Sequence, residues 1–322
     1  MKRLGLIVGL IALLIGAAGL YLGGTLLGGA TVKQETSFVI PAGASLTSVA
    51  KKLEDEGHIA SADGFLMRAR LFGSSDPIQA GEFKLTPEMD QAAILTAFQS
   101  GDVIRRFVTI PEGMPSVMVY DRLMATQLLT GDIEVPPEGS ILPNTYAYER
   151  GATRASLIAQ MQEAMDLALA EEWAKRGPNT AVETMRDALI LASIVEKETG
   201  VPEERRMVAG LYSNRVRTGM LLQADPTIIY PITKGKPLGR RIRQSEIASV
   251  NGYNTYTRVG LPVGPITNPG RESIAAVLNP APTSALFMVA DGTGGHKFAD
   301  TNEEHNANVE EWYKLRRERG EM

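Results

Sequence analysis

An apolar run at 188–195 constrains the fold most, because a mid-chain stretch of this kind must be buried. The run ends abruptly in Glu196 and Glu198, and Gly200 and Pro202 follow as helix stop signals. The sequence therefore predicts a buried helix whose C-terminal end brings two carboxyl groups close to the protein interior.

The end of this helix favours an acid that keeps its proton. The negative end of the helix dipole disfavours an ionised carboxylate, and partial burial acts in the same direction. A carboxyl group that is still protonated near neutral pH can serve as a general acid. The alternative interpretation is a solvated helix end that carries Glu-Lys-Glu without a function.

The two glutamates differ in the helix face that they continue. Glu198 extends the apolar line of Leu191, Ile194 and Val195, whereas Glu196 does not. Residues two positions apart diverge by about 200° around a helix, so both cannot enter one cleft equally. We expect Glu198 to be the acid and Glu196 to be a structural or supporting group.

Composition excludes several classes of function. The chain has 322 residues, no cysteine and a net charge of −4. Without cysteine there are no disulfides, thiolate metal sites or cysteine nucleophiles. The charge provides no polybasic surface, so nucleic acid is not an expected partner.

The N-terminus predicts the location of the protein. Lys2 and Arg3 precede a stretch at 4–32 that contains no charged residue. A bilayer requires about 20 apolar residues, and a secretory signal has an apolar region of only about 7–15. We expect residues 1–32 to be a cytoplasmic tip and an uncleaved transmembrane signal anchor, with the rest outside the cytoplasmic (inner) membrane. Cleavage near residue 30 is the alternative.

Residues 33–108 predict a small α+β module. Strand patterns lie at 36–40, 81–85 and 106–110, and helical patterns lie at 45–54, 62–71 and 89–98. This order is similar to that of a LysM-type glycan-binding unit.

Residues 109–322 predict a larger mixed α+β domain, so the whole chain is assigned to the α+β class. Loop signals occur at 136–139 and 142–146, and an apolar run of strand length lies at 285–290. Helices are expected at 153–176, 182–198 and 203–218, and from residue 302 onwards.

Two polar motifs in this domain are candidates for binding. Gln223 and Asp225 precede Pro226, although Asp-Pro-Thr is also an ordinary turn or helix cap. The segment 252–257 combines Tyr253 and Tyr256 with amides and hydroxyls. That mixture suits a carbohydrate, whose faces stack on aromatic rings, but it also occurs in surface turns.

The histidine-containing motifs do not predict a metal or a serine nucleophile. His296 and His305, with Asn306 beside the latter, lack the spacing typical of metal ligands. A Ser-His-Asp triad is not supported either, because the sequence contains no Gly-x-Ser-x-Gly.

In their order along the chain, these motifs resemble the YceG-like family, the MltG-type endolytic murein (peptidoglycan) transglycosylases. The resemblance rests on the following segments: Ala-Ser-Ile-Val-Glu-Lys-Glu-Thr (192–199), Leu-Gln-Ala-Asp-Pro-Thr (222–227), Tyr-Asn-Thr-Tyr (253–256), Gly-Leu-Pro-Val-Gly-Pro-Ile (260–266), Asn-Pro-Gly (268–270), Gly-Gly-His-Lys-Phe (294–298) and Glu-His-Asn (304–306). It implies a LysM-like module before a YceG-like catalytic domain.

The resemblance also implies an activity. Glycan strands of peptidoglycan would be cut at the MurNAc–GlcNAc β-1,4 bond to give 1,6-anhydroMurNAc ends, with Glu198 as the catalytic acid and base. No cofactor or metal is expected, and wall-synthesis proteins are candidate partners. Substrate-binding or supporting roles are expected for Glu196, Gln223, Asp225, Tyr253, Asn254, Tyr256, Asn268, His296, His305 and Asn306.

Two other functions remain open at this point. A hydrolytic muramidase would use Asp225 as a second carboxylate and would leave reducing ends. A non-catalytic murein-binding scaffold would bind through residues 36–108 and would not cut.

Overall fold

A computed structural model describes residues 13, 14, 16 and 31–321. Within these residues, no helix is long and apolar enough to cross a membrane. The predicted anchor at 1–32 lies almost wholly outside the described part of the chain. Thr31 already contacts the folded chain, because its backbone N–H donates to His58 O at 3.0 Å. Val32 already packs in the first hydrophobic core and is only 6% exposed.

The chain is an α+β protein that divides into two compact units. The first unit ends at Arg106 and the second begins at Phe107. In the part of the chain that the structure describes, the strands form three sheets of two strands each. Most of the buried surface therefore comes from helices and loops rather than from extended sheets.

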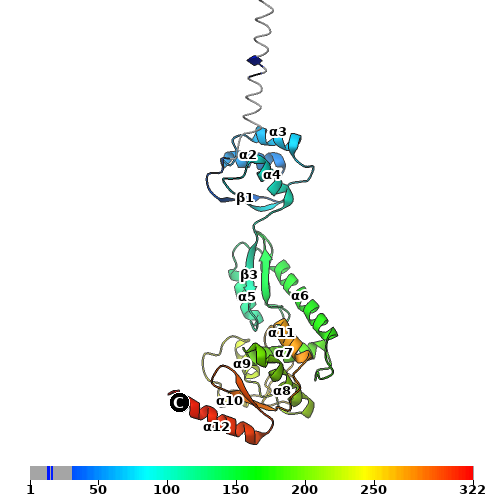
Figure 1. Cartoon of the computed structure of the whole chain (residues 1–322), viewed down its shortest axis with the longest axis vertical. Helices are drawn as coiled ribbons and strands as arrows, with labels where there is room; N and C mark the ends of the chain where they lie inside the picture. The colour runs from blue at the N-terminus through cyan, green and yellow to red at the C-terminus, as the bar shows by residue number, and fades with distance from the viewer. Residues whose placement is uncertain (1–12, 15, 17–30, 322) are drawn as a thin grey trace, which may run out of the picture. The chain divides into compact units, whose positions relative to one another are not determined.

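The first unit places three helices around one antiparallel strand pair. Its elements are β1 (Thr36–Ile40), α2 (Leu46–Asp55), α3 (Ala62–Phe72), β2 (Gly81–Leu85) and α4 (Gln91–Ser100) (Figure 1). Phe38 on β1 faces Phe83 on β2, and the ring of Phe98 stacks on that of Phe38 at 5.6 Å. The strands and helices predicted between residues 36 and 100 are confirmed.

Local capping explains why these helices begin where they do. The side chains of Ser45, Ser61 and Asp90 each accept a hydrogen bond from a backbone N–H in the first turn of the helix that follows. Such caps satisfy donors that have no partner within the helix. Each capping residue directly precedes its helix, so the start of each helix is set locally.

The second unit is mainly helical and contains two small sheets. Its elements are β3 (Arg106–Ile110, beginning at the last residue of the first unit), α5 (Ser116–Ala125), β4 (Asn144–Tyr148), α6 (Arg154–Ala174), α7 (Met185–Glu198), η1 (Pro202–Glu204), α8 (Arg205–Thr218), α9 (Pro226–Thr233), α10 (Gln244–Ile247), α11 (Arg271–Leu278), β5 (Phe287–Ala290), β6 (His296–Ala299) and α12 (Asn302–Glu318). Strand β3 pairs with β4, and β5 pairs with β6.

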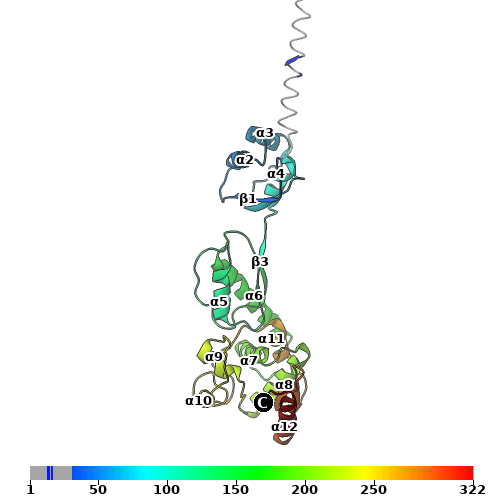
Figure 2. The ribbon, with the colours of Figure 1, turned by 90° about the vertical axis from the view of Figure 1, so that its left-hand side faces the viewer.

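Helix α7 is the central element of the second unit. It packs against α6, α8, α9 and α11, and both views show it among these helices (Figure 1; Figure 2). Its residues 190–195 are all buried, as the apolar run predicts. Because neighbours surround α7, the residues at its C-terminal end reach structural elements that are distant in sequence.

One segment differs from the sequence-based expectation. The loop predicted at 142–146 is partly wrong, because Asn144–Tyr148 forms β4 with Tyr146 and Tyr148 buried on alternate positions. For Asp-Pro-Thr, where a turn or a helix cap was expected, the structure shows the cap. Asp225 is the N-cap of α9, and Pro226 opens the helix at the first helical position, where its missing N–H has no cost.

Candidate functional site

Glu198 is the last residue of α7 and borders a cavity of about 380 Å³. The helix ends there because Thr199 adopts an extended conformation with φ of −135°. This cavity, which we call the acid cavity, is lined by residues from α7, α8, α9, β5 and the loops that precede α9 and α11. Its polar or aromatic lining residues are Lys197, Glu198, Tyr212, Arg215, Gln223, Asp225 and Tyr256.

The carboxyl group of Glu198 has an unusual affinity for protons. Burial, followed by the negative charge of Asp225, raises its pKa to about 7. A hydrogen bond with Tyr212 and the positive charge of Arg215 act in the opposite direction but do not offset the burial. Oε1 of Glu198 is buried and has no hydrogen-bond partner among the described residues. A group that is half-protonated near neutrality can both donate and accept a proton.

Tyr212 and Arg215 on α8 form the inner wall beside Glu198. Tyr212 is 2% exposed, and burial and the neighbouring Glu198 raise its pKa well above the ordinary value. Arg215 donates from Nε to Leu286 O at 2.7 Å and from Nη1 to Leu222 O at 2.6 Å. Tyr212 therefore keeps its proton as a donor, and the guanidinium is fixed by backbone carbonyls.

The outer wall contains Asp225 and Tyr256. The Tyr256 hydroxyl donates to Asp225 Oδ1 at 2.6 Å, and burial together with this carboxylate raises the pKa of Tyr256. Gln223 is exposed and adopts a left-handed backbone with φ of +50°. Residues other than glycine rarely adopt this backbone conformation, and such positions cluster at functional sites.

Two buried threonines hold the segments of the outer wall together. The hydroxyls of Thr227 and Thr255 lie 2.8 Å apart, and Thr255 Oγ1 also accepts from Ala224 N–H at 3.0 Å. The backbone N–H of Gln223 donates to Thr255 O at 3.1 Å. These bonds join the 222–227 and 253–256 motifs, which are separate in sequence.

Three of the predicted site residues lie in the scaffold instead of the cavity wall. The ring of Tyr253 packs on that of Tyr230 with centroids 4.8 Å apart. The fully buried amide of Asn254 donates to backbone carbonyls of its own loop, the shortest bond being 2.6 Å to Ser249 O. Asn268 is also fully buried and accepts from Ile141 N–H at 3.0 Å. Their positions indicate that they hold loops in place.

Glu196 faces a different part of the unit. Its Oε2 accepts from the backbone N–H of Gly270 at 2.9 Å and from Ser273 Oγ at 2.7 Å. Both donors lie at the N-terminus of α11, where a negative charge is favoured by the helix dipole and by unpaired N–H groups. Glu196 therefore connects the end of α7 to the start of α11.

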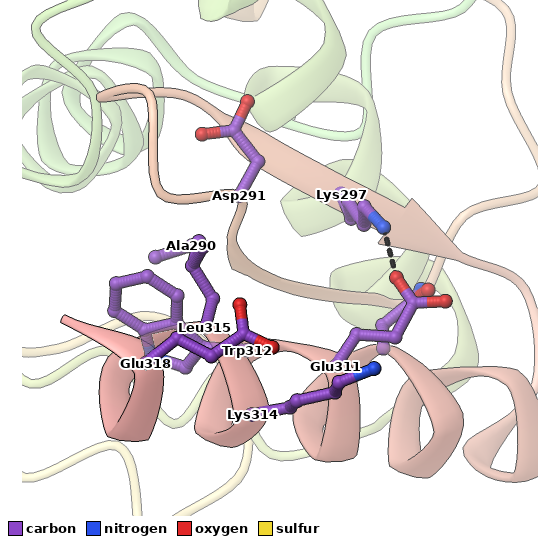
Figure 3. A pocket seen from close by; sticks show the side chains of 9 residues that line it. Ala290, Asp291, Lys297, Glu311, Trp312, Lys314, Leu315 and Glu318 are labelled. Carbon is purple, nitrogen blue, oxygen red and sulfur yellow. Dashed lines mark hydrogen bonds and ion pairs between the residues drawn. The ribbon is translucent and has the colours of Figure 1, made fainter. Parts of the chain in front are cut away.

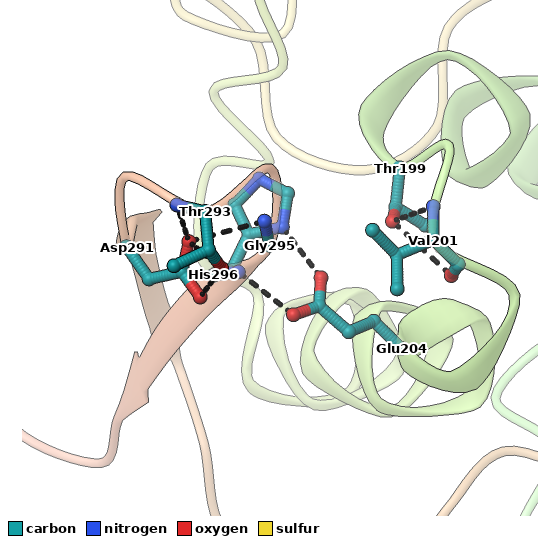
Figure 4. A network of polar contacts seen from close by, with 7 residues as sticks. All are labelled: Thr199, Val201, Glu204, Asp291, Thr293, Gly295 and His296. Atoms are coloured by element: carbon teal, nitrogen blue, oxygen red, sulfur yellow. Dashed lines mark hydrogen bonds and ion pairs between the residues drawn. The ribbon is translucent and has the colours of Figure 1, made fainter.

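The C-terminal motif residues also lie outside the acid cavity. Glu204 accepts from the backbone N–H of His296 at 2.7 Å and contacts its ring Nδ1 at 2.8 Å (Figure 4). The ring of His305 stacks on Phe287 at 5.3 Å, and burial lowers its pKa. Asn306 is exposed on α12. Among the described residues, no group of three or more histidines and carboxylates could hold a metal ion.

A second cavity, of about 270 Å³, lies between the β5–β6 hairpin and α12 (Figure 3). Two of its carboxylates differ from Glu198 in their affinity for protons. Hydrogen bonds from Thr293 lower the pKa of Asp291, and the Lys297 ammonium lowers that of Glu311. Both groups are therefore ionised near neutral pH, unlike a group with the raised pKa of Glu198.

Sequence reasoning did not identify Tyr212, Arg215, Thr227 or Thr255. The one available signal was on α8, where Tyr212 and Arg215 are three residues apart, a spacing that places them on one helix face. Thr227 and Thr255 lie within the 222–227 and 253–256 motifs, but the sequence gives no signal of their pairing, because each partner lies in another segment.

Comparisons with known proteins show similarity over most of the chain. The model of the YceG-like family matches residues 38–311. An endolytic murein transglycosylase of Bacillus subtilis (strain 168) is 28% identical, and the match covers 95% of this chain and 93% of that protein. One of Streptococcus pneumoniae serotype 2 is 31% identical over 239 residues, which cover 72% of this chain but only 40% of that protein.

A solved structure extends the similarity to the fold. The crystal structure of a yceG-like protein from Listeria monocytogenes is 28% identical and has a TM-score of 0.54. The match covers 85% of this chain and 99% of that one.

Proposed function

The chain belongs to the YceG-like family, and we propose that it is an endolytic lytic transglycosylase that cuts peptidoglycan glycan strands at the MurNAc–GlcNAc β-1,4 bond. The observation that carries this proposal is the buried carboxyl group of Glu198, whose pKa is about 7 at the wall of a cavity. The murein transglycosylases of Bacillus subtilis and Streptococcus pneumoniae support the substrate class.

In the first step Glu198 acts as the acid. Its proton goes to the glycosidic oxygen, and the bond between that oxygen and the anomeric carbon of MurNAc breaks. The negative charge left on Glu198 is stabilised by the Tyr212 hydroxyl and the Arg215 guanidinium. The carboxylate of Asp225, across the cavity, favours positive charge that develops on the sugar ring.

In the second step the same carboxylate acts as the base. Glu198 takes the proton from the C6 hydroxyl of the same MurNAc, and the C6 oxygen bonds to the anomeric carbon. The product is a 1,6-anhydro ring, Glu198 has its proton back, and no water is consumed. The attacking hydroxyl belongs to the substrate itself and is already oriented, so proximity contributes to the rate.

A hydrolytic muramidase is the second candidate, and the position of Asp225 favours keeping it. Asp225 lies close enough to Glu198 for its charge to raise the pKa of that acid. In a hydrolase, Asp225 would activate water or attack the sugar. The hydrogen bond from Tyr256 occupies one of its oxygens, so we assign Asp225 an electrostatic role instead.

The products distinguish the two reactions. Full-length protein incubated with uncrosslinked murein strands in H₂¹⁸O should release fragments that end in 1,6-anhydroMurNAc and contain no ¹⁸O. Reducing ends that carry the label would establish the hydrolase and would make Asp225 catalytic. A protein that binds the strands and releases no fragments would be a scaffold.

The N-terminal parts have supporting roles in this proposal. The charge-free stretch at 4–32 would anchor the enzyme in the inner membrane as a single-pass protein, with the catalytic domain on the extracytoplasmic side. The module at 33–108 would be LysM-like and would bind glycan, an assignment that its β1-α2-α3-β2 order supports. Residues 109–322 would then form the catalytic domain.

A further inference from the structure

A groove lies next to the acid cavity in the same unit. It has a volume of about 470 Å³, which is within the range of ordinary ligand sites. Its walls come from residues 111–118 and 226–238, with Lys197 and Ile266 completing the surface. We refer to it as the apolar groove.

Close backbone packing makes the apolar groove a fixed part of the fold. Helix α9 ends at Thr233, its C-cap Lys234 has a left-handed conformation, and Gly235 follows with φ of +84°. A Cβ on Gly235 would lie 2.7 Å from Pro115 Cβ, so only glycine allows the two walls to approach this closely. Ile266, which is 2% exposed, also lines this surface.

The apolar groove and the acid cavity adjoin. Lys197, Pro226 and Ile229 line both of them. None of these three residues is fully buried, so the wall that the two sites share is accessible at the surface. Lys197 is the residue before Glu198, and its Nζ lies 3.5 Å from Gly113 O on the wall of the groove. A ligand held at Glu198 can therefore extend into the groove.

The chemistry of the two sites differs. Tyr212 and Tyr256 give the acid cavity aromatic rings that suit sugar faces, whereas the described residues that line the groove include no aromatic side chain. The groove instead presents aliphatic side chains such as Met118 and Leu238 together with the ammonium of Lys236. This combination does not suit another sugar and fits an aliphatic chain that carries carboxylates.

The charges at the rim leave the ammonium groups accessible. Lys236 Nζ donates to Asp121 Oδ2 at 2.8 Å, and both side chains are about half exposed. An ammonium has three donors, so this pair leaves Lys236 able to bind a further carboxylate. The acidic residue at the rim, Glu112, is paired with Arg205 at 3.4 Å.

We infer that the apolar groove binds the peptide stem of the MurNAc residue whose glycosidic bond lies at Glu198. This inference rests on the proposed function. In murein, the stem is attached to the same sugar and includes residues with methyl side chains and with free carboxylates, beside one diamino acid. Its methyl groups would contact Met118 and Leu238, and its carboxylates would pair with Lys197 and Lys236. The enzyme would thus select strands that still carry their peptides.

The test compares two substrates that differ only in the peptide. Full-length protein is assayed on uncrosslinked glycan strands and on the same strands after an amidase has removed the stems. The wild type should have a kcat/KM at least about tenfold higher on peptide-bearing strands. Lys236→Glu should reduce this preference about fivefold, which corresponds to about 1 kcal/mol. Lys236→Arg, which keeps the charge, should retain it.

Lys297→Glu is the matched control. Lys297 is another half-exposed lysine paired with an exposed carboxylate, that of Glu311, and it does not line the groove. Its substitution should leave the preference unchanged. Equal cleavage of both substrates by the wild type, or an equal effect of Lys236→Glu on both, would overturn the peptide site and leave the transglycosylase proposal intact. Failure to cut either substrate would overturn both.

Discussion

Glu196 and Glu198 are two residues apart at one helix end, yet their surroundings differ in almost every respect. Glu196 accepts hydrogen bonds from Gly270 N–H and Ser273 Oγ at the start of α11. Glu198 has one oxygen that is buried without a hydrogen-bond partner in the described chain. Glu196 thus has hydrogen-bond partners that suit a structural link between α7 and α11, which we call the brace. The surroundings of Glu198 disfavour its charge, which suits a general acid.

The difference arises from segments that are far away in the sequence. Glu198 meets the inner face of α8 and the N-terminus of α9, whereas Glu196 meets the N-terminus of α11. Each principal substitution below changes one of these two regions and leaves the other intact.

The largest expected effect is on catalysis. Glu198→Gln should reduce kcat by about 10³–10⁴-fold, because an amide keeps the size but cannot donate an acidic proton. Glu196→Gln should retain most of the activity. Release of anhydro-muropeptides, measured by mass spectrometry with folding checked by circular dichroism, gives the comparison. An active Glu198→Gln beside an inactive Glu196→Gln would reverse the two roles.

The second effect is on stability and has a defined sign. The pKa of Glu198 is about 7 in the folded protein against an ordinary 4.5, so the folded state binds more protons between these values. Stability is therefore lost as the pH rises through this window, by up to about 3 kcal/mol.

Glu198→Gln should remove this dependence and should be more stable than the wild type at pH 8. The measurement is urea unfolding of both proteins at pH 4.5 and pH 8. If the wild type and Glu198→Gln differ in free energy of unfolding by the same amount at both pH values, Glu198 titrates as an ordinary carboxyl group.

The third effect concerns the brace. Glu196→Gln should lower the free energy of unfolding by about 2 kcal/mol, because hydrogen bonds to a charged group are lost at the start of α11. Glu203→Gln is the matched control, since Glu203 is exposed in the turn that follows α7. Equal stability of the two variants in urea would show that Glu196 is not a brace.

The features of this contrast that depend on neighbouring residues were predictable from the sequence, and those that depend on distant segments were not. The apolar run at 188–195 and the stop at Gly200 are local, and they correctly predicted α7 and its end. The helix-face argument assigned Glu198 to the acid role, but residues on both faces of α7 are buried, including Ala192 and Ser193. The burial pattern along α7 therefore does not predict which glutamate is the acid, and only the partners from other segments distinguish the two.

The same limit applies to the rest of the fold. The elements of the first unit follow from local apolar patterns, and they were predicted closely. Strand β4 was missed because its two buried tyrosines follow loop signals. The bond between Thr227 and Thr255 was missed because neither segment alone indicates that the other is beside it.

The smallest effect refines the acid region. Tyr212→Phe removes the hydrogen bond that lowers the pKa of Glu198, so that pKa should rise further, by about one pH unit. The alkaline limb of kcat/KM should move upward accordingly, and kcat should fall because the carboxylate is less stabilised. Tyr146→Phe is the control, since its hydroxyl donates to Leu142 O at 2.6 Å in a separate core cluster. Equal pH profiles for both variants would remove Tyr212 from the site.

The proton affinity of Glu198 itself is the most direct test of this account. Full-length protein labelled with ¹³C at the glutamate carboxyl carbons can be titrated by NMR, with the Glu198 signal assigned by its loss in Glu198→Gln. We expect this signal to titrate near pH 7, in agreement with the pKa of about 7 that burial and Asp225 produce. A Glu198 signal that titrates near the ordinary value of 4.5 would contradict the assignment of Glu198 as the general acid.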